Sequence, residues 1–482
     1  MKEKIKLIGR EKETASIDKL MHSGRAEFLA VYGRRRVGKT FLIRQYLKNN
    51  MVFDFTGTKD GAKEQQLINF FEEYTKRAGN RKKKQVPLTW HEAFGYLASY
   101  LRQLSKRKIK HVVFIDEMPW IDTPKSEFIS ALEFLWNQHL SKMDNVLLIA
   151  CGSASSWIKK KLIKSRGGLY NRVTHRIHLK PFNLFETELF LNNLGIKLSR
   201  YQVLEIYMAM GGIPFYLNEI SKGKSAAQFI DSTCFVAGGL LHDEYSQLYH
   251  SLFKNADNHI HIIEALASRP QGMARTEIAS KIKISEGSLS RAMEELIDCD
   301  FVSKYQPLIH KKKTSVYKLT DAYSLFYLKF IKTHKGSGKG TWEQLYKSSS
   351  FQAWSGYAFE NIWLVHPSQL RRALGISGVY TILSSWKFTG NDALPGAQID
   401  MIIDRADNTI HLCEAKFTKE NFAITKNYGE QLKLKKTILK QATQTKKTIF
   451  TTLLTTYPAM RNKYYLEEIE NEITMDKLFE PN

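Results

Sequence analysis

Short apolar runs alternate with helix-like periodicity along the first part of the chain. Between the runs, apolar positions recur at helical spacing over 41–47 and again through a long basic region that ends near Lys110. Continuous apolar runs predict strands buried on both faces, here at 28–32, 52–56, 111–117 and 146–153. Strands that alternate with helices predict an α/β fold built on a parallel sheet.

The pattern changes after residue 182, where helix-like periodicity dominates at 184–191 and 201–210. Gly211 and Gly212 interrupt it because they permit a turn, and Pro214 starts the next helix. The chain then has the pattern of a winged helix-turn-helix, with helices at 259–266, 275–282 and 284–296, the last capped by Ser285, and strands at 301–305 and 314–319.

The last third returns to a mixed pattern. The aromatic segment 321–330 predicts a core helix, and 334–341, with its spaced glycines, predicts a linker. A helix that opens at 356 is followed by strands at 399–404 and 410–416, which a turn at 407–408 joins into a hairpin.

A chain of 482 residues is too long for a single core. We predict four parts: an α/β core at 1–182, a helical lid at 183–250, a winged helix domain at 251–333 and an α/β domain at 342–482.

The composition adds a charge argument. Lys and Arg number 72 against 48 Asp and Glu, a formal net charge of +24, and such an excess favours nucleic acid or another polyanion as a partner. The alternative is a basic surface that only keeps the protein in solution. The basic run 81–84 is most simply a solvated loop.

The cysteines and the apolar content indicate a compartment. Cys151, Cys234, Cys299 and Cys413 lie far apart and form no C-x-x-C, so neither a zinc site nor a disulfide framework is expected. We therefore expect a reducing, cytoplasmic location. No stretch has 18 consecutive apolar residues and the N-terminus lacks a signal-peptide core, so no membrane partner is expected.

The most specific motif follows the first predicted strand and opens the first predicted helix of the core. Residues 33–40 read Gly-Arg-Arg-Arg-Val-Gly-Lys-Thr and fit G-x-x-x-x-G-K-[ST], the phosphate-binding loop. Its glycines let successive backbone N–H groups point at a phosphate chain, and the helix N-terminus adds positive charge. We expect Lys39 to reach the β- and γ-phosphates and Thr40 to bind Mg2+. The predicted nucleotide-binding residues here are Gly33, Arg34, Arg35, Arg36, Val37, Gly38, Lys39, Thr40 and Phe41.

A second motif supplies acids. The apolar run at 111–115 ends in Asp116 and Glu117, and a buried parallel strand delivers such carboxylates to the edge of its sheet. Asp116 is expected to hold Mg2+, and Glu117 to polarise the attacking water.

A third motif lies in the predicted C-terminal hairpin. Asp400 and the pair Glu414 and Lys416 form a PD-(D/E)xK pattern, with Ile399 in place of the usual proline. The pattern resembles restriction-endonuclease-like nucleases. Alternate residues share one face of a strand, so Glu414 and Lys416 lie together, and Glu360 would assist from the preceding helix. Two carboxylates can hold Mg2+, and Lys416 can act on a phosphodiester.

Other interpretations of the C-terminal motif stay open: an ordinary amphipathic hairpin, or a nuclease fold that no longer cleaves. Tyr428, Gln431 and Lys435 follow at helical spacing, where they would track a phosphate backbone or form a solvated helix face.

Several further segments together resemble the archaeal-type ATPase family, a group related to origin-recognition AAA+ proteins and STAND switches. They are Gly-Arg-Glu at 9–11, Leu-Tyr-x-Arg at 169–172 with Leu-x-Pro-Phe at 179–182, and Gly-Gly-x-Pro at 211–214. With the motifs above, the resemblance spans nearly the whole chain, and it implies a P-loop NTPase αβα core, a helical lid and a nuclease-like C-terminal domain.

The resemblance also implies roles for single residues. ATP is the expected nucleotide, and Pro214 would border its adenine. Ser153, with Ser155 second, would sense the γ-phosphate. Arg172, with Arg176 as the alternative, would be an arginine finger, either in cis in a monomer or in trans in an oligomer.

Three functions remain open. The first is an ATP-driven switch on DNA, in which Ser285, Ser288, Ser290 and Arg291 face the major groove and wing lysines 311–313 meet phosphates. The second is a Mg2+-dependent nuclease gated by ATP. The third is a signalling ATPase that binds a protein partner and no nucleic acid.

Overall fold

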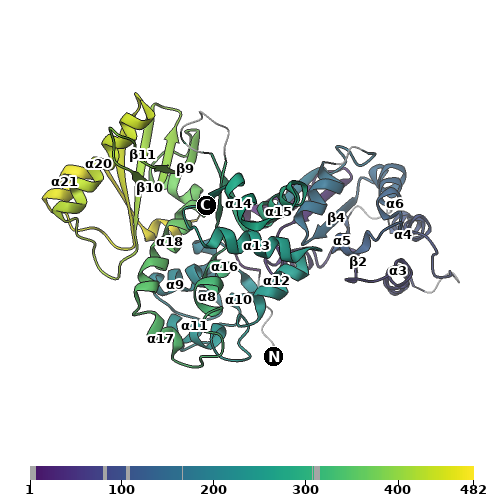
Figure 1. Ribbon diagram of the computed structural model, residues 1–482. Helices are drawn as coiled ribbons and strands as arrows, with labels where there is room; N and C mark the ends of the chain where they lie inside the picture. The colour runs from purple at the N-terminus through teal and green to yellow at the C-terminus, as the bar shows by residue number, and fades with distance from the viewer. Residues whose placement is uncertain are drawn as a thin grey trace. The chain divides into compact units, whose positions relative to one another are not determined.

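The computed structural model describes residues 7–79, 84–104, 109–164, 167–306, 308 and 315–481. The chain forms two compact units, Met1–Lys180 and Pro181–Asn482 (Figure 1). The finer division into lid, winged helix and C-terminal domain stays a prediction. Lysines 311–313 of the predicted wing and residues 81–83 of the basic run lie outside the described residues.

The first unit is built on a five-stranded parallel sheet in the order β2-β3-β4-β1-β5. Its strands are β1 Glu27–Tyr32, β2 Met51–Thr56, β3 His111–Asp116, β4 Val146–Gly152 and β5 His175–His178. The four predicted strands and their parallel arrangement are confirmed. Because all strands run the same way, the segments that follow β1, β3 and β4 share one edge of the sheet.

Helices bury the sheet, which explains why its strands are continuous apolar runs. Every residue of β1, β3 and β4 is buried. Aromatic rings from the covering helices, among them Phe70, Trp90, Phe94 and Phe128, pack together in this core. Figure 1 shows several of these helices around β2 and β4. The helices are α1 Glu11–Met21, α2 Lys39–Tyr46, α3 Lys63–Ala78, α4 Trp90–Leu104, α5 Met118–Ile121, α6 Phe128–Phe134 and α7 Ser155–Ile158, with π-helical turns at Leu135–His139 and Lys159–Ile163 and a 3-10 turn at Leu140–Lys142.

The second unit begins with helices, as predicted: α8 Leu184–Asn193, α9 Arg200–Met210, α10 Pro214–Leu217, α11 Ala226–Cys234 and α12 Glu244–Leu252. Pro214 is the first residue of α10. Asn183 begins α8 with a capping box, in which its side chain accepts from the Glu186 N–H while the Glu186 carboxylate accepts from Asn183 N–H.

The middle segment contains the helices and the hairpin that the sequence predicts. The helices are α13 Ala256–Ala267, α14 Arg275–Ile282 and α15 Glu286–Asp298. They accompany an antiparallel sheet in the order β6-β8-β7, in which β6 Met273–Ala274 lies between α13 and α14, and β7 Val302–Tyr305 and β8 Val316–Leu319 follow α15. Ser285 caps α15 by accepting from the Ser288 N–H. The aromatic segment forms α16 Ala322–Phe326 and a π-helical turn at Tyr327–Ile331, and several of its rings are buried.

The C-terminal segment holds a mixed five-stranded sheet in the order β13-β12-β11-β10-β9. Its strands β9, β10 and β11 pair antiparallel, whereas β11, β12 and β13 pair parallel. Helices α20 and α21 lie beside this sheet in Figure 1. The elements are α17 Thr341–Leu345, α18 Ser349–Val365, α19 Pro367–Ala373, β9 Thr381–Phe388, β10 Ala397–Arg405, β11 Thr409–Lys416, α20 Lys426–Thr443, β12 Thr448–Thr455, α21 Lys463–Glu468, β13 Asn471–Thr474 and the 3-10 turn Met475–Phe479.

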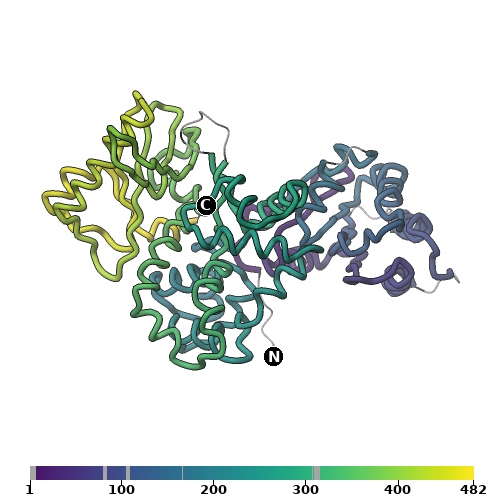
Figure 2. Tube along the Cα trace, viewed as in Figure 1, coloured from purple at the N-terminus to yellow at the C-terminus, as the bar shows by residue number. Residues whose placement is uncertain are grey.

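One helix boundary that the sequence predicted for this segment was wrong. The helix that carries Glu360 begins at Ser349 and not at 356, because Ser348 caps it by accepting from the Phe351 N–H. At the end of the chain, the yellow 3-10 turn in Figure 2 returns beside α8, and there Arg200 forms an ion pair of 2.9 Å with Asp476. Among the described residues, no helix combines the length and the apolar character that a membrane crossing requires.

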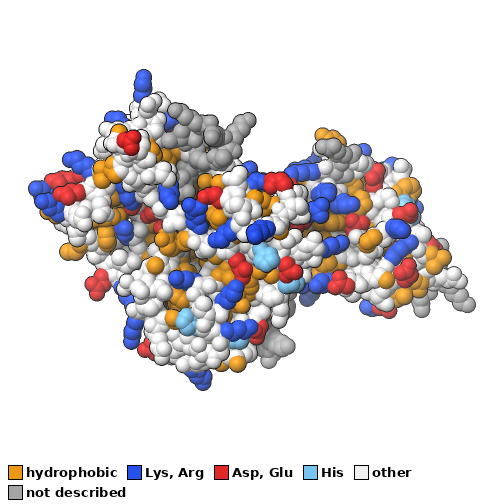
Figure 3. All heavy atoms as spheres, viewed as in Figure 1, with side chains coloured by type: hydrophobic (Ala, Val, Ile, Leu, Met, Phe, Trp, Pro, Cys, Tyr) orange, Lys and Arg blue, Asp and Glu red, His pale blue; other side chains and the backbone are white. Residues whose placement is uncertain are grey.

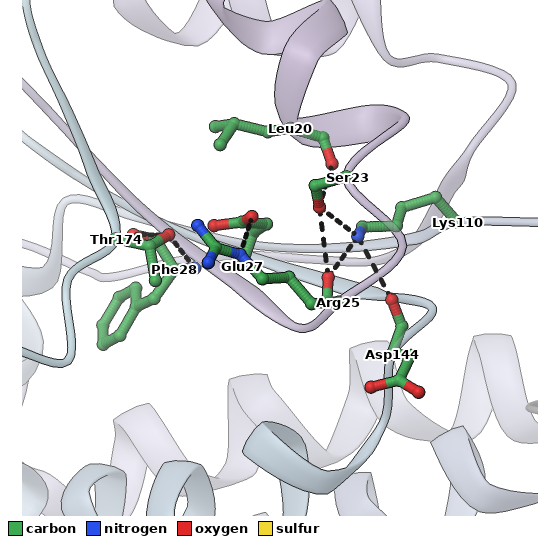
Figure 4. A network of polar contacts seen from close by, with 8 residues as sticks. All are labelled: Leu20, Ser23, Arg25, Glu27, Phe28, Lys110, Asp144 and Thr174. Carbon is green, nitrogen blue, oxygen red and sulfur yellow. Dashed lines mark hydrogen bonds and ion pairs between the residues drawn. The ribbon is translucent and has the colours of Figure 1, made fainter.

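At the N-terminal edge of the first sheet, Lys110 holds several chain segments together (Figure 4). Its ammonium donates to Ser23 Oγ at 3.1 Å, to the Arg25 carbonyl and to the Asp144 carbonyl at 3.2 Å. Lys110 precedes β3, while its partners precede β1 and β4. Burial lowers the pKa of Lys110, whereas the charges of Glu27 and Asp144 favour its protonated form.

We predict that Lys110→Met weakens this edge, because the carbonyls of Arg25 and Asp144 lose a donor. The expected loss is about 1–3 kcal/mol of local stability. Hydrogen–deuterium exchange on peptides from β1 and β4 measures it, with exposed Lys48 changed to Met as the matched control. Equal protection in the two variants would contradict the role given to Lys110.

Candidate nucleotide-binding site

The loop at 33–40 connects β1 to α2 with the backbone conformation that a phosphate-binding loop requires. Gly33, Arg36 and Gly38 have φ of 143°, 69° and 90°. A Cβ atom at Gly33 would stand 2.2 Å from the Leu179 carbonyl oxygen, so only glycine fits there. Gly38 caps α2 and turns its first N–H groups toward the loop.

Lys39 is folded back onto the loop. Its ammonium donates to the carbonyls of Gly33 and Arg34, each at 2.8 Å, and the residue is 5% exposed. A buried cation at the first turn of α2 is placed to exchange carbonyl partners for phosphate oxygens.

Thr40 and Asp116 come together from distant parts of the sequence. The Thr40 hydroxyl donates to Asp116 Oδ2 at 2.6 Å, and Asp116 Oδ1 accepts from the Glu117 N–H at 2.9 Å. Asp116 is the last residue of β3 and is 2% exposed. A hydroxyl and a carboxylate are hard oxygen ligands, so this pair fits Mg2+.

Glu117 follows at the tip of β3 in the left-handed conformation, with φ of 47°. Its Oε2 atom accepts from the Ser153 N–H at 3.0 Å and from the Ser153 hydroxyl at 2.9 Å. Ser153, directly after β4, therefore holds the predicted catalytic carboxylate through two donors. Ser155 is fully buried at the start of α7, and its hydroxyl has no hydrogen-bond partner among the described residues.

The structure does not bring Arg172 to this site. Arg172 is exposed and lies two residues before Thr174, whose N–H donates to the Phe28 carbonyl at 2.9 Å. That pairing marks the start of β1, whereas the phosphate loop follows its end at Tyr32. At about 3.3 Å per residue, Phe28, where Thr174 pairs, and Tyr32, where the loop begins, are roughly 13 Å apart along the strand. Arg176 is also exposed, within β5. Arg176 pairs with Ala30, two residues before the end of β1, so of the two arginines it lies nearer the level of the phosphate loop.

Two loop contacts were missed from the sequence. Arg10, in the Gly-Arg-Glu element, is 4% exposed and donates to the Val37 carbonyl at 3.1 Å. Arg35 stacks over Trp120, with 5.5 Å between the guanidinium carbon and the ring centroid. The Gly-Arg-Glu triplet was visible, but nothing local shows that its arginine reaches a loop 27 residues away.

Pro214, the residue expected to border the adenine, belongs to the second unit.

A second group of charged residues lies in the C-terminal segment. Met401 pairs with Cys413, so Asp400 on β10 stands opposite Glu414 on β11. Asp400 Oδ2 accepts from the Ala415 N–H at 3.1 Å. We call Glu360, Asp400 and Glu414 the carboxylate cluster.

Residues of α20 close over this cluster. Lys435 donates to both carboxylate oxygens of Glu414, at 2.7 and 2.8 Å, and the Tyr428 hydroxyl donates to Glu414 Oε2 at 3.3 Å. The Lys416 ammonium lies 4.4 Å from the centre of the Tyr428 ring. Tyr428 and Lys435 are thus engaged with a buried acid, and of the three predicted helix positions only Gln431 is exposed.

Burial dominates the electrostatics of the cluster. Burial first, and the charge of Asp400 second, raise the pKa of Glu360 and the pKa of Glu414 each to about 7. Lysines oppose the effect: Lys318 lies 3.6 Å from Glu360, and Lys435 binds Glu414. Within the described ranges, no three acidic, histidine or cysteine side chains converge as a ready metal site.

Comparisons with known proteins bear on the first unit and on part of the second. The profile of one family, described as an ATPase domain predominantly from Archaea, matches residues 7–220. This range contains every residue of the nucleotide site above, and it also contains Pro214.

Two relatives come from Methanocaldococcus jannaschii. An uncharacterized protein is 23% identical over 358 residues, which make up 74% of this chain and 76% of that protein. An uncharacterized ATP-binding protein is 33% identical over 48 residues, 10% of this chain and 81% of its own length.

Two solved structures are similar as well. A Walker-type ATPase of Pyrococcus abyssi aligns with a TM-score of 0.48 and 16% identity over 67% of this chain and 96% of that one. The ORC2 protein of Aeropyrum pernix aligns with a TM-score of 0.42 and 14% identity over 72% of this chain and 98% of that one.

Proposed function

We propose that the protein hydrolyses ATP with Mg2+ as a nucleotide-driven switch, since residues 7–220 match the profile of an ATPase domain predominantly from Archaea. The observation that supports hydrolysis is the assembly of Lys39, Thr40, Asp116 and Glu117 at one edge of the sheet, with Ser153 bound to the last of them.

Each residue has a role that follows from its contacts. Lys39 exchanges its two carbonyl partners for phosphate oxygens and neutralises the charge that develops there. Thr40 and Asp116 hold Mg2+, which screens the phosphate charge when it is bound. Nucleotide binding thus replaces the hydrogen bond between Thr40 and Asp116.

Glu117 is the proposed general base. Both donors of Ser153 bind the same oxygen, Oε2, so Ser153 fixes the direction of the carboxylate. We assign the proton-accepting role to Oε1. Ser153 then acts as a positioning residue, in place of the direct γ-phosphate sensor that the sequence suggested.

We predict that Glu117→Gln keeps ATP binding but lowers ATP turnover by about 10²- to 10⁴-fold, because the amide cannot accept the proton from water. Phosphate release at saturating ATP measures turnover, and equilibrium binding of a fluorescent ATP analogue checks the site. Lys39→Ala is the matched comparison and is expected to lose binding as well. Wild-type turnover in Glu117→Gln would remove this residue from the mechanism.

DNA is the polyanion on which we propose that the switch acts. The net charge of +24 and the three helices with their hairpin support this. On the face that Figure 3 shows, lysine and arginine side chains are scattered among acidic ones. Helix α15 carries acidic side chains close to its candidate base-reading residues. At its start, Arg275 donates to Glu286 and to Ser290, and farther along the helix Glu294 is exposed near Arg291. We therefore propose that the protein contacts DNA mainly through the phosphate backbone and less through the base edges.

Gel shifts with a duplex over a salt series test this proposal. ATP is expected to change the affinity of the wild type and to leave that of Lys39→Ala unchanged, with a linear fall of log K against log salt. Binding to DNA no tighter than to heparin, and equal with and without ATP, would contradict it and favour the protein-partner alternative.

A second candidate activity is Mg2+-dependent cleavage of nucleic acid in the C-terminal segment. The pairing of Asp400 with Glu414, with Lys416 two residues on and Glu360 close by, supports it. Carboxylate oxygens fit Mg2+, and a lysine at this place can stabilise the attacked phosphodiester.

We predict that any cleavage by this chain depends on Mg2+ and is lost in Asp400→Asn, while ATP turnover is kept, because Asp400 lies in the second unit. End-labelled single-stranded and duplex DNA and RNA are suitable substrates. Cleavage that persists in Asp400→Asn would assign the activity elsewhere.

A further inference from the structure

Lys318 is a buried lysine that reaches out of its own sheet. It lies on β8 of the middle segment and is 3% exposed, yet its ammonium lies 3.6 Å from Glu360 Oε2 on α18. The next residue repeats the connection, because the Leu319 carbonyl accepts from Asn361 Nδ2 at 3.2 Å. Two consecutive residues of β8 are therefore bound to two consecutive residues of α18.

The charges around Lys318 are those of the carboxylate cluster. Burial lowers the pKa of Lys318, and the negative charges of Glu360 and Asp400 oppose that shift. Glu414, the third acid, has Lys435 as its cation. Glu360 and Glu414 thus each have a lysine ammonium as ion-pair partner, while Asp400 accepts from the Ala415 N–H.

We propose that Lys318 is an internal cation that closes the carboxylate cluster to divalent metal ions until β8 moves away. This inference rests on the second candidate activity, because it assigns that site a built-in regulator. An ammonium beside Glu360 and a divalent ion repel each other in a buried space, so the Lys318 ammonium weakens the binding of a divalent ion by the cluster. Withdrawal of Lys318 leaves Glu360 without its ion-pair partner, while Glu414 keeps Lys435, and the added negative charge favours the binding of a divalent ion.

The contact is part of a larger docking of the hairpin. Leu308, between β7 and β8, packs against the core cluster of the C-terminal sheet, which includes Trp386 and Ile399. A movement of β8 away from α18 would therefore also disturb the packing of Leu308 on this sheet.

The test measures Mn2+ binding to the full-length, nucleotide-free protein by the EPR signal of free Mn2+. Lys318→Met keeps the length of the side chain without its charge and is expected to bind one Mn2+ about tenfold tighter than the wild type, or tighter still. Adding Asp400→Asn to this variant is expected to abolish the gain. Lys318→Arg, which keeps the charge, is expected to stay at the wild-type value.

Lys304→Met is the matched control, since Lys304 is exposed on the neighbouring strand β7. Lys318→Gln provides a second neutral variant if the methionine variant does not fold. Wild-type Mn2+ affinity in a folded neutral variant would overturn the proposal, whether or not the protein cleaves nucleic acid. Tighter Mn2+ binding without cleavage of DNA or RNA would uphold it and remove only the nuclease candidate.

Discussion

A single hydrogen bond, from the Thr40 hydroxyl to the Asp116 carboxylate, joins the phosphate loop to the acidic tip of β3. The remaining features of the first unit serve to make this contact possible. The parallel sheet brings the ends of β1, β3 and β4 to one edge, and the aromatic core fixes the strands in register. Gly33 allows the chain to pass the Leu179 carbonyl, and Arg10 supports the far side of the loop. The loop is thereby preorganised before any nucleotide arrives.

Both candidate sites share one electrostatic design, in which protein groups already satisfy the reactive side chains. Lys39 is bound to two carbonyls, Glu117 to Ser153 and Glu414 to Lys435. A buried charge without partners would be strongly destabilising, so these contacts keep the ligand-free protein stable. Activity at either site then consists of exchanging internal partners for phosphate, metal or water. The difference in free energy between the internal contacts and the contacts with phosphate, metal or water decides when each site is active.

The same contacts show that some of the basic residues lie in the interior and do not face a partner. Lys39, Lys110 and Lys318 are buried, and Lys435 is bound to a buried acid, so part of the net charge of +24 serves the interior. The other basic residues visible in Figure 3 are interspersed with acids. Net charge alone therefore describes the partners of this protein less well than the positions of individual lysines.

The sequence by itself determined the elements whose information is local. The loop at 33–40, the buried strands, the acids at the end of β3, the cap at Ser285 and the hairpin with Asp400 and Glu414 all lie where the pattern places them, because periodicity, glycine and capping residues act over a few positions. Only the tertiary structure decided which distant residues meet. Ser153 holds Glu117, Arg172 lies at the level of the opposite end of β1, and Lys318 enters the cluster beside Glu360. These pairings depend on strand order and on how segments pack against one another, and one sequence read alone carries no signal for either.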